Sequence, residues 1–352
     1  MFFFQELYLA AVTLRDVAAS SGVSVATVSL VLNGKGNISP AVRTRVLDSA
    51  QTIGYVKNIH ASAMASRRSS HVAVLVDESY EKAFEWHLIR SILIPLEASL
   101  STQQYYPILI PVTRSQTTDQ IVEKVLLSGA GAMFAIHFGE KDLFQRLEDR
   151  GIAVMLLNHD RGEHSFHSVT DDFVNGTLRA TNHLLEQGHR DLIYLDYARP
   201  DLPGVEFDRR IGFLKAAQES AYRVRYEDHT IPGLRSISEI ETLIDTLTHA
   251  HRDDHLSIVC HDDYLAAQVY AVLVTKKIDV PEHASIIAPG DTLDYSLPFI
   301  PQITTYRTDF ELMGTLAGQV MLRRFDGTGR VAESLKVQQV LQERGSVKQI
   351  HQ

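Results

Sequence analysis

The sequence of 352 residues predicts a small all-α head followed by an α/β body of two doubly wound parallel-sheet lobes. Three short helical segments separated by turn residues occupy 13–55, and from residue 71 short apolar runs alternate with helical stretches. The charge changes at the same point. Residues 11–70 contain seven basic and two acidic residues, whereas 71–352 carry a net charge of −13. A basic head on an acidic body indicates that only the head contacts phosphate.

The first helix of the head is predicted to begin after Thr13. Thr13 and Asp16 stand three residues apart, as in a capping box, and Asp16 lies near the positive end of the helix dipole. Gly22 gives the following turn a permissive backbone. The apolar residues of one face of this helix are Leu14, Val17 and Ala18.

Two further helices complete the predicted head. Ser24 caps a second helix that runs to Leu32, with Val28, Val31 and Leu32 facing inward. After the breaker cluster 33–37, Ser39 and Pro40 form a strong start signal for a third helix, which Gly54 ends. The apolar stripe expected for this third helix is Val42, Val46, Leu47, Ala50 and Ile53.

Three helices with this turn spacing are typical of a helix-turn-helix, in which the start of the second helix meets the base edges of DNA. Ser24 and Thr27 are short hydroxyl residues suited to phosphates. Val25 and Ala26 are small and apolar, so the feature they can contact is a thymine methyl group. Leu30 lies one turn further along the same exposed side. The alternative interpretation is an ordinary packed three-helix bundle.

Length and composition limit the remaining classes of protein. The length predicts two or three domains, and a single cysteine, Cys260, fits a reducing cytoplasm without disulfides. Residues 1–11 are apolar but lack a basic segment and are too short to span a membrane, so we expect a disordered extension and no membrane association. The spacing of histidines and glycines indicates no metal or cofactor, although His159, His164 and His167 cluster with Asp160.

The body is predicted from alternating strands and helices, and about 280 residues suit two lobes better than one. Predicted strands are Val72–Val76, Tyr106–Pro111, Ala132–Ile136, Ala153–Leu157, Asp191–Leu195, Ser257–Cys260 and Ser285–Ala288. Predicted helices include Phe84–Leu100, Val174–Gln187, Arg209–Ser220, Ser238–Ala250 and Leu265–Lys276. Ligands of such sheets bind at the carboxyl ends of the strands, where polar loop residues follow.

Residues 12–68 closely resemble the head of the LacI/GalR family of bacterial transcription regulators. The segments VTLRDVAASSGVSVATVSLVLNG and VRTRVLDSAQTIGYVKN match its patterns VT-x-x-DVA, GVS-x-x-TVS-x-VLN and GY-x-x-N without gaps. The resemblance continues more weakly to Val347 through VTDDFVNGTLRATNHLLEQGHRDLIYL, RRIGF, CHDDYLAAQV, IPQITTYR and LQERGSV.

For the head, the resemblance implies DNA contacts and a hinge helix that forms on DNA. Met64 falls at the position of an apolar side chain that wedges a minor-groove base step, where leucine is usual. Lys57 departs from the family, which usually has proline there. The candidate DNA-binding residues are Thr13, Leu14, Ser24, Val25, Ala26, Thr27, Ser29, Leu30, Asn33, Arg43, Asn58, Ala61, Met64 and Ala65.

For the body, the resemblance implies two periplasmic-binding-protein-like lobes joined by three crossovers, with an effector in the cleft. Arg209 matches an arginine that forks onto the effector, and Asp291 aligns with an effector-binding aspartate, although PGDT departs from the usual motif. Asp262 stands where asparagine is usual. The candidate effector-binding residues are Asp77, Phe84, Trp86, His137, Asn158, Arg209, Asp262 and Asp291.

We therefore expect a dimeric, cytoplasmic regulator, a repressor of a near-palindromic operator, whose small-molecule effector is a sugar or sugar derivative. The expected domains are an extension at 1–11, the head at 12–56, a hinge at 57–70, the body at 71–347 and a tail at 348–352. The alternatives are a regulator of the same fold that responds to a protein partner, an enzyme built on the α/β body, and a transport-type binding protein. No nucleophile elbow, phosphate-binding loop or paired-carboxylate motif supports the enzyme.

Overall fold

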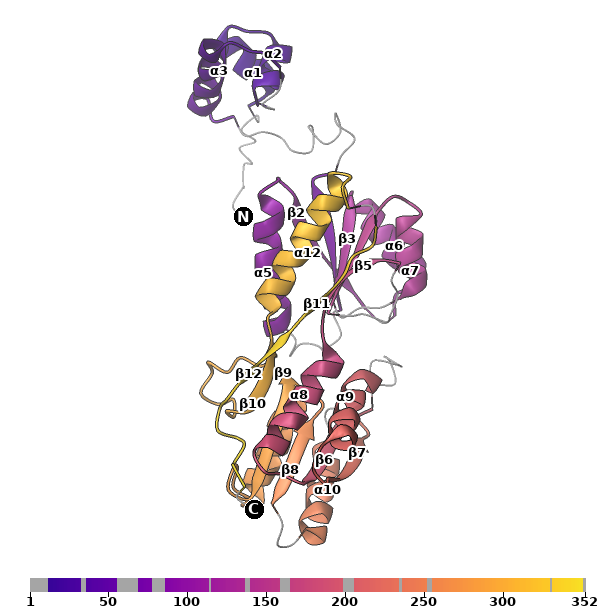
Figure 1. The fold of residues 1–352 in the computed structure, drawn as a ribbon. Helices are drawn as coiled ribbons and strands as arrows, with labels where there is room; N and C mark the ends of the chain where they lie inside the picture. The colour runs from indigo at the N-terminus through magenta and orange to yellow at the C-terminus, as the bar shows by residue number, and fades with distance from the viewer. Residues whose placement is uncertain are drawn as a thin grey trace, which may run out of the picture. The chain divides into compact units, whose positions relative to one another are not determined.

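A computed structural model of the chain shows two compact units, Met1–Arg68 and Ser69–Gln352 (Figure 1). The residues that it describes are 12–32, 36–55, 69–77, 86–113, 115–136, 140–158, 165–198, 206–233, 236–251, 255–329 and 331–350, without the side chains at 77, 86, 206 and 207.

The head consists of α1 (Leu14–Ser21), α2 (Val25–Leu32) and α3 (Pro40–Thr52) around one small core. The carboxylate of Asp16 accepts hydrogen bonds of 2.7 Å from both the backbone N–H and the hydroxyl of Thr13, and these bonds lower the pKa of Asp16. Gly22 adopts a left-handed conformation with φ of 64°. Helices α1 and α2 meet at 104°, as in a helix-turn-helix. The core residues are Val17, Ala18, Val28, Val31, Val46 and Ala50.

The predicted apolar stripe of α3 is wrong at one position. Val46 and Ala50 are buried, and Val42 and Ile53 pack against the same core, but the side chain of Leu47 is 47% exposed. A residue one position after Val46 points about 100° away around the helix, so Leu47 leaves the buried face.

The first lobe of the body, here called the N-lobe, contains a six-stranded sheet in which every pair of neighbours is parallel. Its order is β11-β5-β4-β3-β1-β2. The strands are β1 (His71–Asp77), β2 (Tyr106–Val112), β3 (Ala132–Ile136), β4 (Ala153–Leu157), β5 (His167–Asp171) and β11 (Ser334–Val337). One face packs on α5 (Trp86–Ser101) and α12 (Phe310–Phe325), and the other on α6 (Thr118–Leu127) and α7 (Lys141–Glu148).

The second lobe, the C-lobe, contains a six-stranded sheet in the order β12-β10-β9-β8-β6-β7. Its strands are β6 (Asp191–Tyr197), β7 (Arg225–Ile231), β8 (Leu256–Cys260), β9 (Ala284–Gly290), β10 (Thr304–Thr308) and β12 (Gln339–Gln342). Helices α8 (Phe173–Glu186) and α9 (Glu206–Glu219) cover one face, whereas α10 (Ile237–Ala250) and α11 (Asp263–Thr275) cover the other. The edge strand β12 runs antiparallel to β10, so this sheet is not wholly parallel as predicted.

The chain passes between the lobes three times, after β5, after β10 and after β11 (Figure 1). Each passage joins the carboxyl end of a strand in one lobe to an element of the other. The carboxyl ends of the central strands of both sheets therefore face the joint between the lobes, which is where ligands of such sheets bind.

All seven predicted strands of the body form, but the sequence prediction missed others. β7 and β12 are edge strands with polar residues, and β5, β10 and β11 contain alternating or polar residues in place of an apolar run. Among the described residues, no single helix is long and apolar enough to cross a membrane; α1 and α2 pass that test only as a bent pair.

Candidate nucleic-acid interface and effector cleft

The start of α2 is capped as predicted, and the cap uses both predicted hydroxyl residues. The backbone N–H of Thr27 donates to Ser24 Oγ at 3.1 Å, and the two hydroxyl oxygens lie 2.9 Å apart. This cap satisfies an N–H group that the helix itself leaves without a partner. Only one of the two hydroxyls donates in the bond between them, so the other keeps its hydrogen and can donate it to a phosphate oxygen.

The apolar residues of α2 are divided between the core and the surface. Val28 and Val31 are buried, whereas Val25 is 41% exposed, Leu30 is 40% exposed and Ala26 is exposed. The head thus presents apolar side chains on the helix that a helix-turn-helix inserts into the major groove. Such side chains contact thymine methyl groups and form no hydrogen bonds to base edges.

The structure describes only some of the other residues predicted to contact DNA. Thr13 is exposed, Ser29 and Arg43 are half-buried, and Leu14 packs against the core of the head, so its role is at least partly structural. The remaining candidates, Asn33, Asn58, Ala61, Met64 and Ala65, lie outside the described residues.

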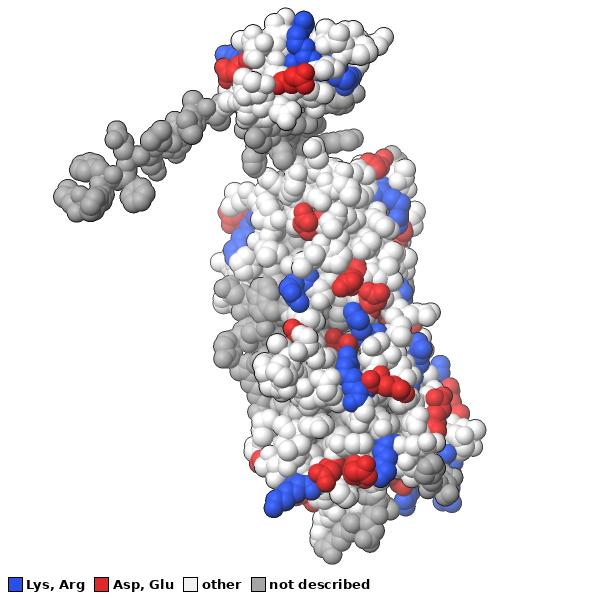
Figure 2. All heavy atoms as spheres, turned by 90° about the vertical axis from the view of Figure 1, so that its left-hand side faces the viewer, with Lys and Arg blue, Asp and Glu red and all other residues white. Residues whose placement is uncertain are grey.

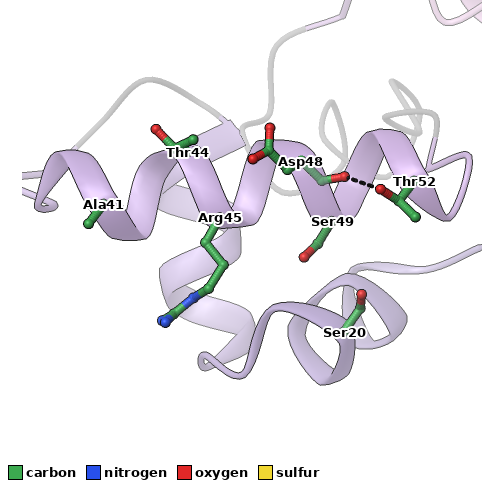
Figure 3. Close-up of a pocket in the computed structure, with 7 residues that line it drawn as sticks. All are labelled: Ser20, Ala41, Thr44, Arg45, Asp48, Ser49 and Thr52. Carbon is green, nitrogen blue, oxygen red and sulfur yellow. Dashed lines mark hydrogen bonds between the residues drawn. The ribbon is translucent and has the colours of Figure 1, made fainter.

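A second surface of the head is a shallow groove of about 620 Å³ between α1 and α3. Figure 3 shows Arg45 and Ser49 pointing from α3 toward the helix that carries Ser20. The Thr52 hydroxyl donates to the backbone carbonyl of Asp48 along α3. None of the residues that line this groove is a predicted DNA contact, so the groove and the exposed face of α2 are separate surfaces.

In the C-lobe, Arg209 lies at the carboxyl ends of the strands with an unused donor. Its side chain is 9% exposed, and Nη1 donates to the backbone carbonyl of His261 at 2.7 Å. The guanidinium also lies over the ring of Phe173 at 5.2 Å. Arg209 Nε is buried without a hydrogen-bond partner among the described residues, so it can bind a hydroxyl or carboxylate oxygen of a ligand.

His261 and its neighbours form a cluster that the sequence prediction did not select. His261 Nδ1 lies 3.2 Å from Asp196 Oδ1 and 3.3 Å from the hydroxyl of Tyr194, and Tyr197 packs edge-on against the imidazole. Asp196 and Tyr197 end β6, whose carboxyl-end residues the sequence analysis left out although the same rule applied to them.

Asp262, by contrast, accepts hydrogen bonds from other groups of the protein. Its Oδ1 accepts the backbone N–H of Leu265 at 2.8 Å and caps α11, and its Oδ2 accepts the hydroxyl of Tyr197 at 2.8 Å. Each carboxylate oxygen keeps a further lone pair, so the predicted role in effector binding would add a contact to these two hydrogen bonds.

Asp291 is also engaged, in an ion pair with the C-terminal segment. Arg344 Nη1 lies 2.7 Å from Asp291 Oδ1, Arg344 Nη2 donates to Oδ2 at 3.1 Å, and the Thr305 hydroxyl donates to Oδ1 at 2.6 Å. With φ of 71°, Asp291 occupies the left-handed region. It borders a polar pocket of about 110 Å³, too small for the usual 300–1,000 Å³ of a ligand cavity.

The remaining effector candidates are described only in part. Asn158 follows β4, is buried and adopts φ of 52°. Asp77 ends β1 and Trp86 begins α5, but their side chains lie outside the described residues, as do Phe84 and His137 entirely. His167 accepts the backbone N–H of Glu333 at its Nδ1, and within the described parts of the chain no group of side chains could hold a metal ion.

Comparison with known families gives matches to both units. Residues 13–58 match the family described as bacterial regulatory proteins, lacI family, and residues 181–347 match the periplasmic binding protein-like domain. The sucrose operon repressor of Escherichia coli is 24% identical, with 91% of this chain and 96% of the repressor covered. The HTH-type transcriptional regulator GalS of Salmonella typhimurium is 28% identical, with 90% and 91% covered.

Solved structures share the fold over nearly the whole chain. The lac repressor dimer bound to operator and the anti-inducer ONPF superposes with a TM-score of 0.77 at 19% identity, covering 96% of this chain and 99% of the repressor. The complex of the transcriptional regulator CelR with cellobiose superposes with a TM-score of 0.64 at 24% identity, covering 95% of this chain and 99% of CelR. The order of head and two-lobed body and the two family matches lead to one conclusion: the chain belongs to the lacI family of bacterial regulatory proteins.

Proposed function

We propose that this protein is a sequence-specific DNA-binding repressor whose affinity for its operator is controlled by a small molecule bound between the two lobes. The observation that carries the proposal is the exposed apolar face of a capped α2, on a head joined to a two-lobed body. The predicted contacts of the hinge, Asn58, Ala61, Met64 and Ala65, would supply the minor-groove part of the interface. The site of action is the bacterial cytoplasm.

The DNA-binding part is tested by selecting bound duplexes from a random pool with the full-length protein. The expected result is a near-palindromic consensus with half-sites about one helical turn apart. Val25→Ser should weaken binding to that consensus about tenfold, as expected for loss of a contact to a base edge.

Leu47→Ser is the matched control, because Leu47 is a similarly exposed apolar residue of the head but lies on α3. It should leave the affinity unchanged. Binding that is sequence-blind and strongly salt-dependent would contradict the proposal, because phosphate contacts alone give that behaviour. Met64→Ala should weaken specific binding if the predicted wedge operates.

We propose a sugar or sugar derivative as the effector. The relatives support this class, since one is named as a sucrose operon repressor and another is a complex with cellobiose. Arg209 supports it structurally, because its buried Nε is available to an oxygen of the ligand. The cleft is proposed to bind its ligand without turnover.

The effector is tested by thermal shift of the protein with a panel that begins with sucrose and cellobiose. Arg209→Met should abolish any shift, whereas Arg210→Met should retain it, because Arg210 is paired with Asp228 away from Arg209. A panel without any shift would favour the alternative of a protein partner. The observation that supports this alternative is that Asp262 and Asp291 already bind other groups of the chain, Asp262 through two hydrogen bonds and Asp291 through an ion pair with Arg344.

We further propose a homodimer. Large apolar side chains are exposed on α5 and on the loop between β9 and β10, where Ile94 is 60% and Phe299 is 76% exposed. Figure 2 views the side of the body that carries α5 and shows broad uncharged areas between the acidic and basic side chains. Analytical ultracentrifugation should give twice the 39.4 kDa of one chain, and Phe299→Glu should shift the equilibrium toward monomer.

A further inference from the structure

The three crossovers of the body meet in one buried cluster of polar side chains. Asp171 ends β5, Thr308 ends β10 and Gln339 begins β12, so each crossover contributes one residue. All three residues are at most 2% exposed. Segments that are far apart in sequence therefore touch at the joint about which the lobes would rotate.

Hydrogen bonds connect every pair in this cluster. Thr308 Oγ1 donates to Asp171 Oδ2 at 2.7 Å, and Gln339 Nε2 donates to the same oxygen at 2.7 Å. Gln339 Nε2 also donates to Thr308 Oγ1 at 2.9 Å. The bond between Gln339 and Thr308 lies within the C-lobe, where β12 pairs with β10, whereas the two bonds to Asp171 join the C-lobe to the end of β5 in the N-lobe. Hydrogen bonds are sensitive to distance and angle, so rotation of one lobe against the other would break the two bonds to Asp171 together.

The position of Gln339 depends on Gly176 in α8. A Cβ atom at residue 176 would lie 1.7 Å from Gln339 Oε1, so the amide packs directly on the glycine backbone. Gln339 Oε1 is buried and has no hydrogen-bond partner among the described residues. An unsatisfied buried acceptor raises the free energy of this arrangement, which brings an alternative arrangement closer in energy.

We propose that Asp171, Thr308 and Gln339 form a hinge lock that holds the lobes as seen here and opens in a second arrangement. The inference rests on the proposed function, because it supplies the two-state element that an effector would bias. Weakening the lock would shift the ratio of the two arrangements before any ligand binds.

The test measures the distance between the lobes by double electron–electron resonance on the full-length protein without ligand. Spin labels at Glu123→Cys in α6 and Glu241→Cys in α10 report on the two lobes, and both sites are exposed. The native Cys260 is fully buried, and burial raises the pKa of its thiol, so it should not be labelled. Labelled chains are diluted into excess unlabelled protein so that one subunit per assembly carries the labels.

Thr308→Val removes the hydroxyl at nearly constant volume and should change the ratio of lobe distances about three- to tenfold, as expected for loss of the one buried hydrogen bond that Thr308 donates between the lobes. Gly176→Ala keeps all three partners and displaces only the Gln339 side chain, so it should shift the ratio in the same direction. Thr181→Val is the control, since Thr181 is equally buried but its hydroxyl donates to the Thr177 carbonyl within α8 and takes no part in the lock.

The proposal is overturned if neither variant changes the distance distribution, or if Thr181→Val changes it as much. Circular dichroism identifies a variant that does not fold, in which case Gln339→Met replaces it. The same variants are then titrated with the selected operator. A changed distance distribution with unchanged operator affinity would refute the regulatory role of the lock. Failure of the wild type to bind any specific DNA would instead refute the proposed function, because the distance measurement needs no DNA.

Discussion

The buried carboxyl group of Asp263 should lower the free energy of unfolding of the body as the pH rises. The substitution Asp263→Asn should remove this pH dependence. The carboxyl group is fully buried at the start of α11. It accepts the hydroxyl of Thr292 at 2.7 Å and the backbone N–H of Leu293 at 2.9 Å. Burial, which outweighs these hydrogen bonds, raises the pKa of Asp263 from its ordinary value of 3.8 to about 6, and the charges of Asp262 and Asp291 act in the same direction.

The sign follows from proton linkage. Because the pKa of Asp263 is higher in the folded than in the unfolded chain, the folded state binds the proton more tightly between pH 3.8 and 6. The free energy of unfolding therefore falls as the pH rises through this window and stays low above it. A shift of this size corresponds to about 3 kcal/mol in total, of which about 2 kcal/mol falls between pH 4.5 and 7.5.

Asparagine resembles the protonated form of Asp263. It keeps an acceptor oxygen for the Leu293 N–H, and the Thr292 hydroxyl can accept from its amide. Urea denaturation followed by circular dichroism at pH 4.5 and 7.5 measures the free energy of unfolding of both proteins. These two pH values avoid the sequence pI of about 6.0, where low net charge favours association. Relative to the wild type, Asp263→Asn should gain about 2 kcal/mol more at pH 7.5 than at pH 4.5.

Asp119→Asn is the control, because the side chain of Asp119 is 82% exposed in an ion pair with Arg146. It should change the free energy of unfolding by less than about 1 kcal/mol at either pH. An equal effect of Asp263→Asn at both pH values, or a loss of stability confined to pH 7.5, would refute the argument from burial.

Three further predictions concern packing and charge. Val46→Ala should destabilise the head by about 2 kcal/mol and Leu47→Ala by no more than about 0.5 kcal/mol, measured by thermal unfolding; equal losses would contradict the observed orientation of α3. Gly212→Ala places a Cβ 2.2 Å from a backbone oxygen of α8 and should cost about 3 kcal/mol in urea denaturation, whereas Gly233→Ala has space and should cost little. Two histidine hydrogen bonds outweigh burial and lower the pKa of Glu227, so Glu227→Gln should lower the unfolding midpoint at pH 7 and have no effect well below pH 4.

Local patterns in the sequence were sufficient for the elements of the head and for most of the body. Caps and turns act over a few residues, so Thr13, Ser24 and Pro40 could be placed from their neighbours alone. Buried parallel strands are continuous apolar runs, and these were predicted at their observed positions. The edge strands β7 and β12 could not be found in this way, because one side of each lacks a neighbouring strand and the polar residues there are tolerated.

In the cleft between the lobes, the sequence predicted the positions of polar residues but not their hydrogen-bond partners. The sequence identified Arg209, but the contacts that determine which of its donors remains available come from His261, 52 positions away. It also placed Asp291 and Asp262 at the ends of strands, yet the structure engages one with Arg344 and the other with Tyr197. A sequence motif gives a residue's position, but its partners depend on which strands are neighbours in the sheet.

By itself, then, the sequence determined the head, its charge, the alternating body and the family, because these depend on residues close together in the chain. Only the tertiary structure decided that Asp262 binds Tyr197 and that Asp291 binds Arg344. It also decided that Leu47 is exposed and that Asp171, Thr308 and Gln339 meet. The last three residues span 168 positions and share a contact because three crossovers converge at one joint. No local propensity encodes such a contact, since it exists only once both lobes have formed.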